Sequence, residues 1–270
     1  MKILRNVQVV KFFLVGLLLG GGIIGPMMKQ NMQWKEVFLE RETADFDTKL
    51  LAPPREVWNL KGGEKICYLT FDDGPSENTE KILDILERYQ IRATFFVVGD
   101  ELRKGGAKVM QRMIRDGHTI GMHADVHVYE QLYAGMDSFL KDYESLYQTL
   151  DEDFGVKPSI FRFPGGSVCT CLEGRGKAYI QEMESRGFTC FDWNVSGEDA
   201  VGSPSIISIQ KNVLSKGLAC RRAIVLLHDS AMADKTVEAL PGIIEKFKEE
   251  GFVFASLEHA EGYVFPASRE

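Results

Sequence analysis

Two adjacent aspartates, Asp72 and Asp73, follow a short apolar run and precede Gly74-Pro75. Because neighbouring side chains at the end of a strand point to opposite sides, one carboxylate could bind a cation while the other stays free as a base. An ordinary turn is the alternative interpretation, since D-G-P is common turn chemistry and Asp73 could cap a helix that begins near Glu77. Taken alone, the pair favours the turn.

Two histidines four positions apart, His123 and His127, could share one face of a helical turn and bind a single metal ion. Together with the carboxylate of Asp73 they form a ligand set that suits Zn²⁺ and leaves one coordination position open. An open position is typical of a hydrolytic site rather than a structural one. A surface pair of histidines is the alternative interpretation of this spacing by itself.

A third histidine, His228, ends the apolar run 224–228 and is followed by Asp229. Histidine is the side chain best suited to proton transfer near neutral pH, whereas a core histidine with a satisfied hydrogen bond is the alternative. Of the five histidines, three stand beside acidic residues at expected strand ends. By comparison, His118 and His259 are expected to be structural.

Other catalytic schemes find less support in the sequence. Gly165-Gly166-Ser167 is not followed by the glycine that completes a nucleophile elbow, and no phosphate-binding P-loop occurs. A pair of carboxylates that cleaves a glycosidic bond would use Asp72 with Glu198 or Asp199. That scheme would leave the histidines without a role.

Short β-rich runs alternate with amphipathic segments from residue 65 onward. Strands are predicted at 66–71, 93–99, 119–123, 160–163, 189–195, 224–228 and 252–257. Helices are predicted at 79–89, 107–116, 136–154, 178–186, 204–216 and 235–250, where apolar residues recur at helical spacing. This alternation predicts an α/β fold with a parallel sheet covered by helices, either an open doubly wound sheet or a barrel.

The polar residues of interest fall at the ends of these predicted strands. Asp72, His123 and His228 each end a strand, while Arg162 and Trp193 lie near the ends of two others. Parallel β/α folds gather their active sites at the carboxyl ends of the strands, and packing alone hardly explains so many such groups at one rim. The residues therefore predict a metal-dependent hydrolase at this rim.

Composition limits the partners. The chain has 270 residues, 44% of them hydrophobic, and a formal net charge of −7. This length is enough for one substantial core. An acidic chain offers no broad phosphate-binding surface, so we expect no nucleic acid as a partner, and no protein partner is indicated.

The N-terminal segment differs from the rest of the chain. Basic residues precede the uncharged run 12–28, which is near the short limit of about 17 residues for a helix that spans a bilayer. This order predicts a cytoplasmic N-terminus and an exported remainder. Since no A-x-A-like cleavage site is present, a single-pass cell-membrane anchor is favoured over a cleaved signal, which would give a secreted protein. We expect an anchor or signal at 1–31, a stalk at 32–63 and an extracytoplasmic catalytic domain at 64–265.

The odd number of cysteines, five, implies at least one free thiol or an intermolecular bond. Cys67, Cys190 and Cys220 lie in or beside apolar segments and are expected as buried small hydrophobes. Cys169 and Cys171 are not spaced as C-x-x-C, and no second pair completes a zinc site. We expect no disulfide framework, and the state of Cys169 and Cys171 is left open.

Taken in order, five segments resemble the motifs of a known family, the NodB-homology polysaccharide deacetylases of carbohydrate esterase family 4. The segments are 70–75, 123–127, 161–166, 193–199 and 226–228. The resemblance covers roughly residues 64–260. It implies a distorted (β/α)7-type barrel and a metal-dependent hydrolase that removes N-acetyl groups from a polysaccharide.

The resemblance also implies roles at the metal and at the base. Asp73, His123 and His127 match the metal ligands of the family, usually of zinc but also of other divalent metals. Asp72 matches the catalytic base. Arg162 matches the residue that orients this base.

Further matches concern the acid and the substrate. His228 matches the general acid, and Asp199 matches the carboxylate that tunes it. The backbone N–H of Gly165 is implied as an oxyanion donor, and the side chains of Trp193 and Leu226 as walls around the acetyl methyl group. The substrate-binding positions implied by the family are Gly165, Pro164, Trp193 and Leu226.

Three departures from the family pattern concern the substrate more than catalysis. Ala124 replaces the Ser or Thr common after the first histidine, and Ser196 and Ala200 replace an Asp and a Trp. Gly165-Gly166 replaces a frequent aromatic residue and is expected to open that wall. Exported location favours N-acetylglucosamine-type residues of peptidoglycan as the substrate. Chitin-type polymers, O-acetylated polymers and a catalytically silent carbohydrate-binding module remain alternatives.

Overall fold

The computed structural model describes residues 50–57 and 63–268. The predicted anchor or signal and residues 32–49 and 58–62 of the predicted stalk lie outside these residues, so the three domain boundaries stay predictions. No helix in the described part of the chain is both long enough and apolar enough to cross a bilayer.

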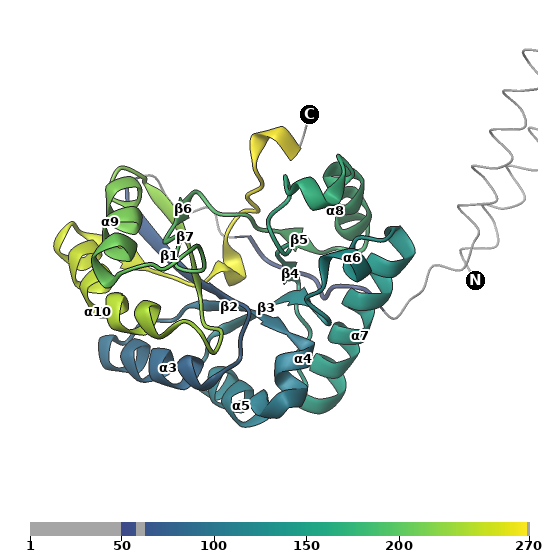
Figure 1. Ribbon diagram of the computed structural model, residues 1–270, viewed down its shortest axis with the longest axis horizontal. Coiled ribbons are helices and arrows are strands. Elements are labelled where there is room, and N and C mark those ends of the chain that lie inside the picture. Colours follow the sequence, from purple (N-terminus) through teal and green to yellow (C-terminus); the bar gives the residue numbers. More distant parts are fainter. Residues whose placement is uncertain (1–49, 58–62, 269–270) are drawn as a thin grey trace, which may run out of the picture. The chain divides into compact units, whose positions relative to one another are not determined.

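One curled parallel sheet organises the described residues (Figure 1). Its strands are β1 (Lys65–Asp72), β2 (Thr94–Val98), β3 (Thr119–Ala124), β4 (Ile160–Phe161), β5 (Thr189–Cys190), β6 (Val195–Ser196), β7 (Arg222–His228) and β8 (Phe252–Phe254). Seven of them follow the order β5-β4-β3-β2-β1-β7-β6, and β8 also pairs with β1. The predicted parallel sheet is confirmed, but within the described residues it forms a half-barrel, because the end strands β5 and β6 do not pair with each other.

Six long helices cover the outside of this sheet (Figure 1). They are α3 (Glu77–Tyr89), α5 (Ala107–Arg115), α7 (Met136–Phe154), α8 (Gly176–Ser185), α9 (Ile206–Gly217) and α10 (Asp234–Glu249). Shorter turns are α4 (Gly99–Glu101), η1 (Leu102–Gly106), α6 (Tyr129–Leu132), η2 (Thr170–Leu172), η3 (Leu257–His259) and η4 (Pro266–Ser268). Every predicted helix is present, with ends within a few residues of the prediction.

The predicted strand 189–195 is wrong as a single element. Its first half, β5, pairs with β4, and its second half, β6, pairs with β7. Between them Phe191 still donates its backbone N–H to Phe161, whereas Asn194 donates to Ile224 on the opposite side of the half-barrel. The segment therefore changes partner in its middle, which a run of β-formers cannot reveal.

Two apolar clusters lie on the two sides of the sheet. On β1, alternate residues pack into the outer cluster beneath the helices, namely Cys67, Leu69 and Phe71. Ile66 and Tyr68, between them, belong to the inner cluster inside the half-barrel. The same alternation places Thr70 and Asp72 on the inner side. Asp72 therefore ends its strand at the mouth of the half-barrel.

Asp73 does not cap a helix, so the turn interpretation is wrong on this point. Ser76 caps α3 instead, in a capping box with Thr79. Asp73 has a φ of 74°, a left-handed conformation that Asp tolerates better than most residues. Because Asp73 lies in this turn and does not cap α3, its carboxylate is available to other side chains.

One cysteine pair, whose state the sequence leaves open, is joined in the structure. Cys169 and Cys171 form a disulfide within residues 63–268, because the tight turn η2 holds their Cα atoms 5.2 Å apart. This bond links no distant elements, so it is not a disulfide framework, and it gives the state of the pair that the sequence leaves open. Cys67, Cys190 and Cys220 are free; the first two are buried as predicted, whereas Cys220 is only partly buried.

Candidate active site and metal centre

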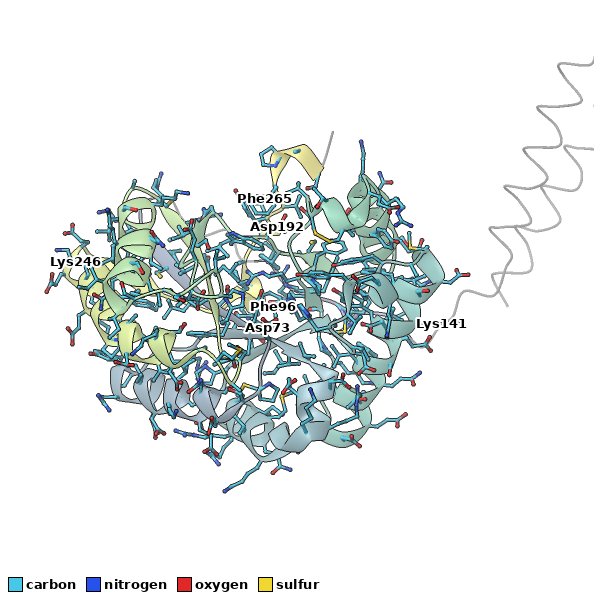
Figure 2. All side chains as sticks on the ribbon, in the orientation of Figure 1. Asp73, Phe96, Lys141, Asp192, Lys246 and Phe265 are labelled. Carbon is cyan, nitrogen blue, oxygen red and sulfur yellow. A yellow bond between two sulfur atoms is a disulfide. The ribbon has the colours of Figure 1, made fainter. Side chains whose placement is uncertain are left out.

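Asp73, His123 and His127 converge at the mouth of the half-barrel. Asp73 Oδ1 lies 3.3 Å from His123 Nε2 and 3.4 Å from His127 Nε2. One ligand atom from each residue lies within 4.8 Å of the other two. Figure 2 shows Asp73 near the middle of the half-barrel. Asp73 directly follows β1, His123 lies near the end of β3 as the sequence predicts, and His127 lies in the loop after β3.

The donor set fits a divalent cation. Asp73 Oδ1 is buried, and no described residue gives it a partner with hydrogen-bond geometry. A buried carboxylate oxygen without a partner is costly unless a cation compensates it. Burial alone would raise the pKa of Asp73, but His123, His228 and His127 hold it below its usual value. One carboxylate and two imidazoles are ligands that zinc accepts.

The rest of the site fixes the orientation of His123. Its Nδ1 lies 3.0 Å from the backbone carbonyl oxygen of Arg162, which leaves Nε2 directed at Asp73. The hydroxyl of Tyr143 donates to the carbonyls of both His123 and Arg162, over 2.7 and 3.1 Å. Tyr143, which the sequence analysis did not single out, therefore joins β3 to the segment that follows β4.

The loop between the two histidines is held by Asp142 on α7, another residue that the motifs do not indicate. Its carboxylate accepts from the backbone N–H groups of Asp125 and Val126, over 2.7 and 2.9 Å. Burial raises the pKa of Asp142 to about 6 despite these two hydrogen bonds. Asp142 thus supplies the bracing of this loop that Ala124, which lacks a hydroxyl, cannot supply.

Arg162 holds Asp72 from inside the half-barrel. Its Nη1 donates to Asp72 Oδ1 over 2.8 Å, and both side chains are buried. Asp72 Oδ2 lies 3.8 Å from His123 Nε2, so the second oxygen faces the candidate metal centre. The predicted base and its orienting residue are therefore in contact.

Several groups fix the guanidinium of Arg162 in turn. It donates to Thr70 Oγ1 over 2.7 Å and to the backbone carbonyls of Phe191 and Asp192 over 2.8 and 3.2 Å. Its Cζ lies 4.2 Å from the ring centroid of Phe96. A buried cation with this many acceptors keeps one position, so the carboxylate of Asp72 is also fixed.

His228 lies across from this base and pairs with Asp199. Its Nδ1 lies 2.8 Å from Asp199 Oδ1, and its backbone N–H donates to Asp199 Oδ2 over 2.8 Å. Thr236 on α10 also donates to Asp199 Oδ2, over 2.6 Å. Asp72 and His228 are register partners of β1 and β7, which puts the predicted base and acid on neighbouring strands.

The pairing with Asp199 keeps His228 protonated at neutral pH. Burial would lower the pKa of His228, but the hydrogen bond to Asp199 and the charges of Asp199, Asp72 and Asp73 raise it to about 9. A histidine in this state can give up a proton.

Asp229 contacts the turn 72–75 that follows β1. Its backbone N–H donates to the carbonyl of Asp72, and its Oδ2 accepts from Thr79 over 2.6 Å. A Cβ on Gly74 would lie 2.1 Å from that oxygen, so only glycine fits there. Burial, followed by the charges of Asp73 and Asp72, raises the pKa of Asp229 to about 7.

The predicted substrate positions surround the same mouth. Leu226 precedes His228 by two residues on β7 and therefore lies on the same inner side of the sheet. Trp193 lies between β5 and β6, with its ring centroid 5.8 Å from Arg162 Cζ. The carbonyl of Pro164 accepts from Tyr133, and Gly165 is exposed with a φ of 79°. All the predicted site residues thus gather at one end of the half-barrel.

A family model, polysaccharide deacetylase, matches residues 59–190. The chain is 31% identical over 200 residues to YheN of Bacillus subtilis, whose name assigns it to this family, with 73% of this chain and 68% of YheN covered. It is 28% identical over 262 residues to a peptidoglycan-N-acetylglucosamine deacetylase of Bacillus cereus, with 94% and 90% covered.

Solved structures agree with these matches. The catalytic domain of a peptidoglycan N-acetylglucosamine deacetylase from Eubacterium rectale is 31% identical with a TM-score of 0.73, covering 79% of this chain and 97% of that one. A CE4 esterase of Streptococcus mutans is 30% identical with a TM-score of 0.65, covering 72% and 86%. The chain therefore belongs to the polysaccharide deacetylase family, carbohydrate esterase family 4 with NodB homology, and is a polysaccharide N-deacetylase.

Proposed function

We propose that this enzyme removes the acetyl group from N-acetylglucosamine-type residues of peptidoglycan, outside the cytoplasmic membrane. Relatives named as peptidoglycan N-acetylglucosamine deacetylases, from Bacillus cereus and Eubacterium rectale, support the polymer. The basic and apolar pattern of the first residues supports export and a single-pass anchor. The observation that carries the chemistry is the register pairing of Asp72 with His228 beside the Asp73, His123 and His127 cluster.

In this proposal Asp73, His123 and His127 hold a divalent cation, which we take to be zinc. When bound, such a cation polarises an acetamide carbonyl and makes water more acidic. The chain contributes a fixed position for each ligand, since Arg162 orients His123 and Asp142 holds the loop before His127.

Asp72 acts as the general base. Its Oδ1 is occupied by Arg162, so Oδ2, which faces the His123 side, is the oxygen that takes the proton of the attacking water. Attack converts the acetamide carbonyl into a tetrahedral oxyanion. Gly165 is exposed, and its backbone N–H donates to this oxyanion as it forms.

His228 acts as the general acid. An amine is a poor leaving group until it is protonated, and His228 carries the required proton because its pKa is about 9. Transfer of that proton to the sugar nitrogen breaks the C–N bond and yields acetate and a free amine. The alkoxide of an acetate ester depends less on protonation to leave than the nitrogen of an amide does. The protonated His228 therefore favours an amide substrate over O-acetylated polymers.

Acetate release from purified peptidoglycan and from chitin oligomers tests this proposal, with a chelator and then zinc added back. We expect acetate from both substrates, faster release from peptidoglycan, loss of activity with chelator and recovery with zinc. Faster release from chitin would reject the polymer that we propose. Products that stay fully acetylated on both substrates would reject N-deacetylation and favour an ester substrate or a carbohydrate-binding module.

A further inference from the structure

The C-terminal segment of the described chain, 263–268, extends the sheet on its open side. Tyr263 forms a parallel bridge with Phe191, just after β5, and its carbonyl accepts from the backbone N–H of Asp192 over 2.6 Å. In Figure 1 this yellow segment runs through the gap between β5 and β6 toward the marked C-terminus. Because the bridge is parallel, the segment runs in the direction of the strands, toward the end where the active site lies.

A buried carboxylate ties this segment to the loop that follows β4. Asp192 accepts from the backbone N–H of Phe265 over 2.7 Å and from the backbone N–H of Ser167 over 2.9 Å. The hydroxyl of Ser167 also donates to Asp192. Figure 2 shows Asp192 and Phe265 close together on the side of the C-terminus. The position of Phe265 is therefore set by hydrogen bonds and not only by packing.

The ring of Phe265 packs edge to face against the ring of Trp193, one of the predicted substrate-binding residues. The ring centroids of Phe265 and Trp193 are 5.1 Å apart, with an angle of 82° between the ring planes. Both side chains are only partly buried. Such a pair prefers a defined geometry, and the part of each side chain that is not buried can contact a ligand.

The two rings occupy the space beside Gly166. A Cβ at this position would lie 2.9 Å from Trp193 Cη2 and 3.1 Å from Phe265 Cε2. The space beside Gly166, which the sequence predicts to be open, is therefore filled by the side chains of Trp193 and Phe265. An aromatic residue from the C-terminal segment takes the place that a side chain at 166 would need.

We propose that Phe265 is a specificity-determining residue, which forms with Trp193 an aromatic wall for the sugar ring next to the one being deacetylated. The flat C–H face of a β-linked glucosamine ring is apolar and suits contact with an aromatic ring. This proposal rests on the polysaccharide deacetylase activity, and it holds for peptidoglycan and chitin alike because both present this ring face.

The test compares wild type with Phe265→Ala and Phe265→Tyr on chitotetraose and on p-nitrophenyl acetate, which has no neighbouring sugar ring to contact Phe265. For the alanine variant we expect KM for the tetramer to rise about 2- to 10-fold while kcat stays within about twofold. Its rate on the small ester should stay unchanged, and tyrosine should restore KM. An unchanged KM in the alanine variant, or an equal loss on both substrates, would overturn the proposal.

Val264→Ala is the matched control, because Val264 is buried in the same segment but belongs to the outer apolar cluster. We expect this control to lower Tm and leave KM unchanged. A rise in KM equal to that of Phe265→Ala would show that segment packing, rather than the ring, is responsible. If the alanine variant does not fold, Phe265→Leu keeps an apolar side chain without the aromatic face and should show the same rise in KM.

Calorimetric binding of chitotetraose separates this proposal from the proposed function. If wild type released no acetate from either polymer, the proposed function would fail. The tetramer should nevertheless bind about 2- to 10-fold more weakly to Phe265→Ala than to wild type. Equal dissociation constants would overturn the role of Phe265 whatever the activity.

Discussion

The guanidinium of Arg162 donates to Oδ1 of Asp72 over 2.8 Å, with both side chains buried. The backbone carbonyl of the same arginine lies 3.0 Å from His123 Nδ1. Arg162 therefore sets the direction of the proposed base with its side chain and that of a proposed metal ligand with its backbone. Substitutions at this position should disturb the base and leave the ligand largely in place, since only the side chain changes.

We expect Arg162→Lys to lower kcat about 10- to 100-fold, because an ammonium group cannot replace the guanidinium at all its acceptors at the same time. Steady-state kinetics on chitotetraose would measure this loss. Zinc content, measured on the same preparation, should remain close to that of wild type, since the carbonyl that orients His123 is retained. An unchanged kcat would contradict the orienting role.

The raised pKa of His228 predicts a limit to activity at high pH. A general acid must be protonated, so kcat/KM should fall as the pH rises through about 9. Asp199→Asn removes the charged hydrogen-bond partner of the imidazolium, which lowers the pKa of His228. The alkaline limb of the pH profile should therefore move to lower pH in this variant. An alkaline limb at the same pH in the variant and in wild type would mean that a group other than His228 causes it.

Asp142 should matter for stability and metal retention although it contacts no proposed ligand side chain. Its two backbone hydrogen bonds are charge-assisted, and their loss in Asp142→Ala should cost about 1–3 kcal/mol. We expect the alanine variant to lose zinc to a competing chelator sooner than wild type does. Asp142→Asn, which keeps one acceptor, should fall between the two, whereas equal zinc retention in all three would contradict the bracing role.

Asp229 predicts a pH-dependent stability difference. Its carboxyl has a pKa of about 7 when folded, above the usual 3.8, so the folded state holds this proton after the unfolded state has released it. Stability from this group is therefore lost as the pH rises from about 4 to about 7. Asp229→Asn removes this dependence.

The difference in Tm between Asp229→Asn and wild type should consequently become more favourable to the variant between pH 5 and pH 8. Each 1 kcal/mol corresponds to roughly 2–4 °C for a domain of this size, so the change is measurable by thermal unfolding. A difference that does not vary with pH would mean that Asp229 is ionised in the folded state across this range.

Local patterns predicted most of the fold. The helix 136–154 was predicted with the bounds that α7 has, because apolar residues such as Phe139, Leu146 and Leu150 recur on one face. Gly117, Gly187 and Gly251 each follow a predicted helix and have a positive φ, the conformation that commonly ends a helix. The division of 189–195 into β5 and β6 was missed, since it depends on which distant strand each half meets.

In the site too, residues in short motifs can be predicted from the sequence, whereas residues that contact the site from distant parts of the chain cannot. Asp72, Asp73, His123 and His127 stand in short motifs, so their types and spacing are visible in the sequence. Asp142, Thr236 and Phe265 act across long stretches of chain, and nothing adjacent in sequence marks them. A charged residue beside the buried Phe139 and Tyr143 on α7 is the one signal that could have indicated Asp142.

The most direct test of the division between cation ligands and proton carriers compares wild type with Asp72→Asn. Both proteins are loaded with zinc, their metal content is measured, and acetate release from chitotetraose is followed. We predict equal zinc content and a rate at least about 100-fold lower in the variant, because the amide cannot accept the proton of the attacking water. Equal rates of acetate release from the two zinc-loaded proteins would contradict the account.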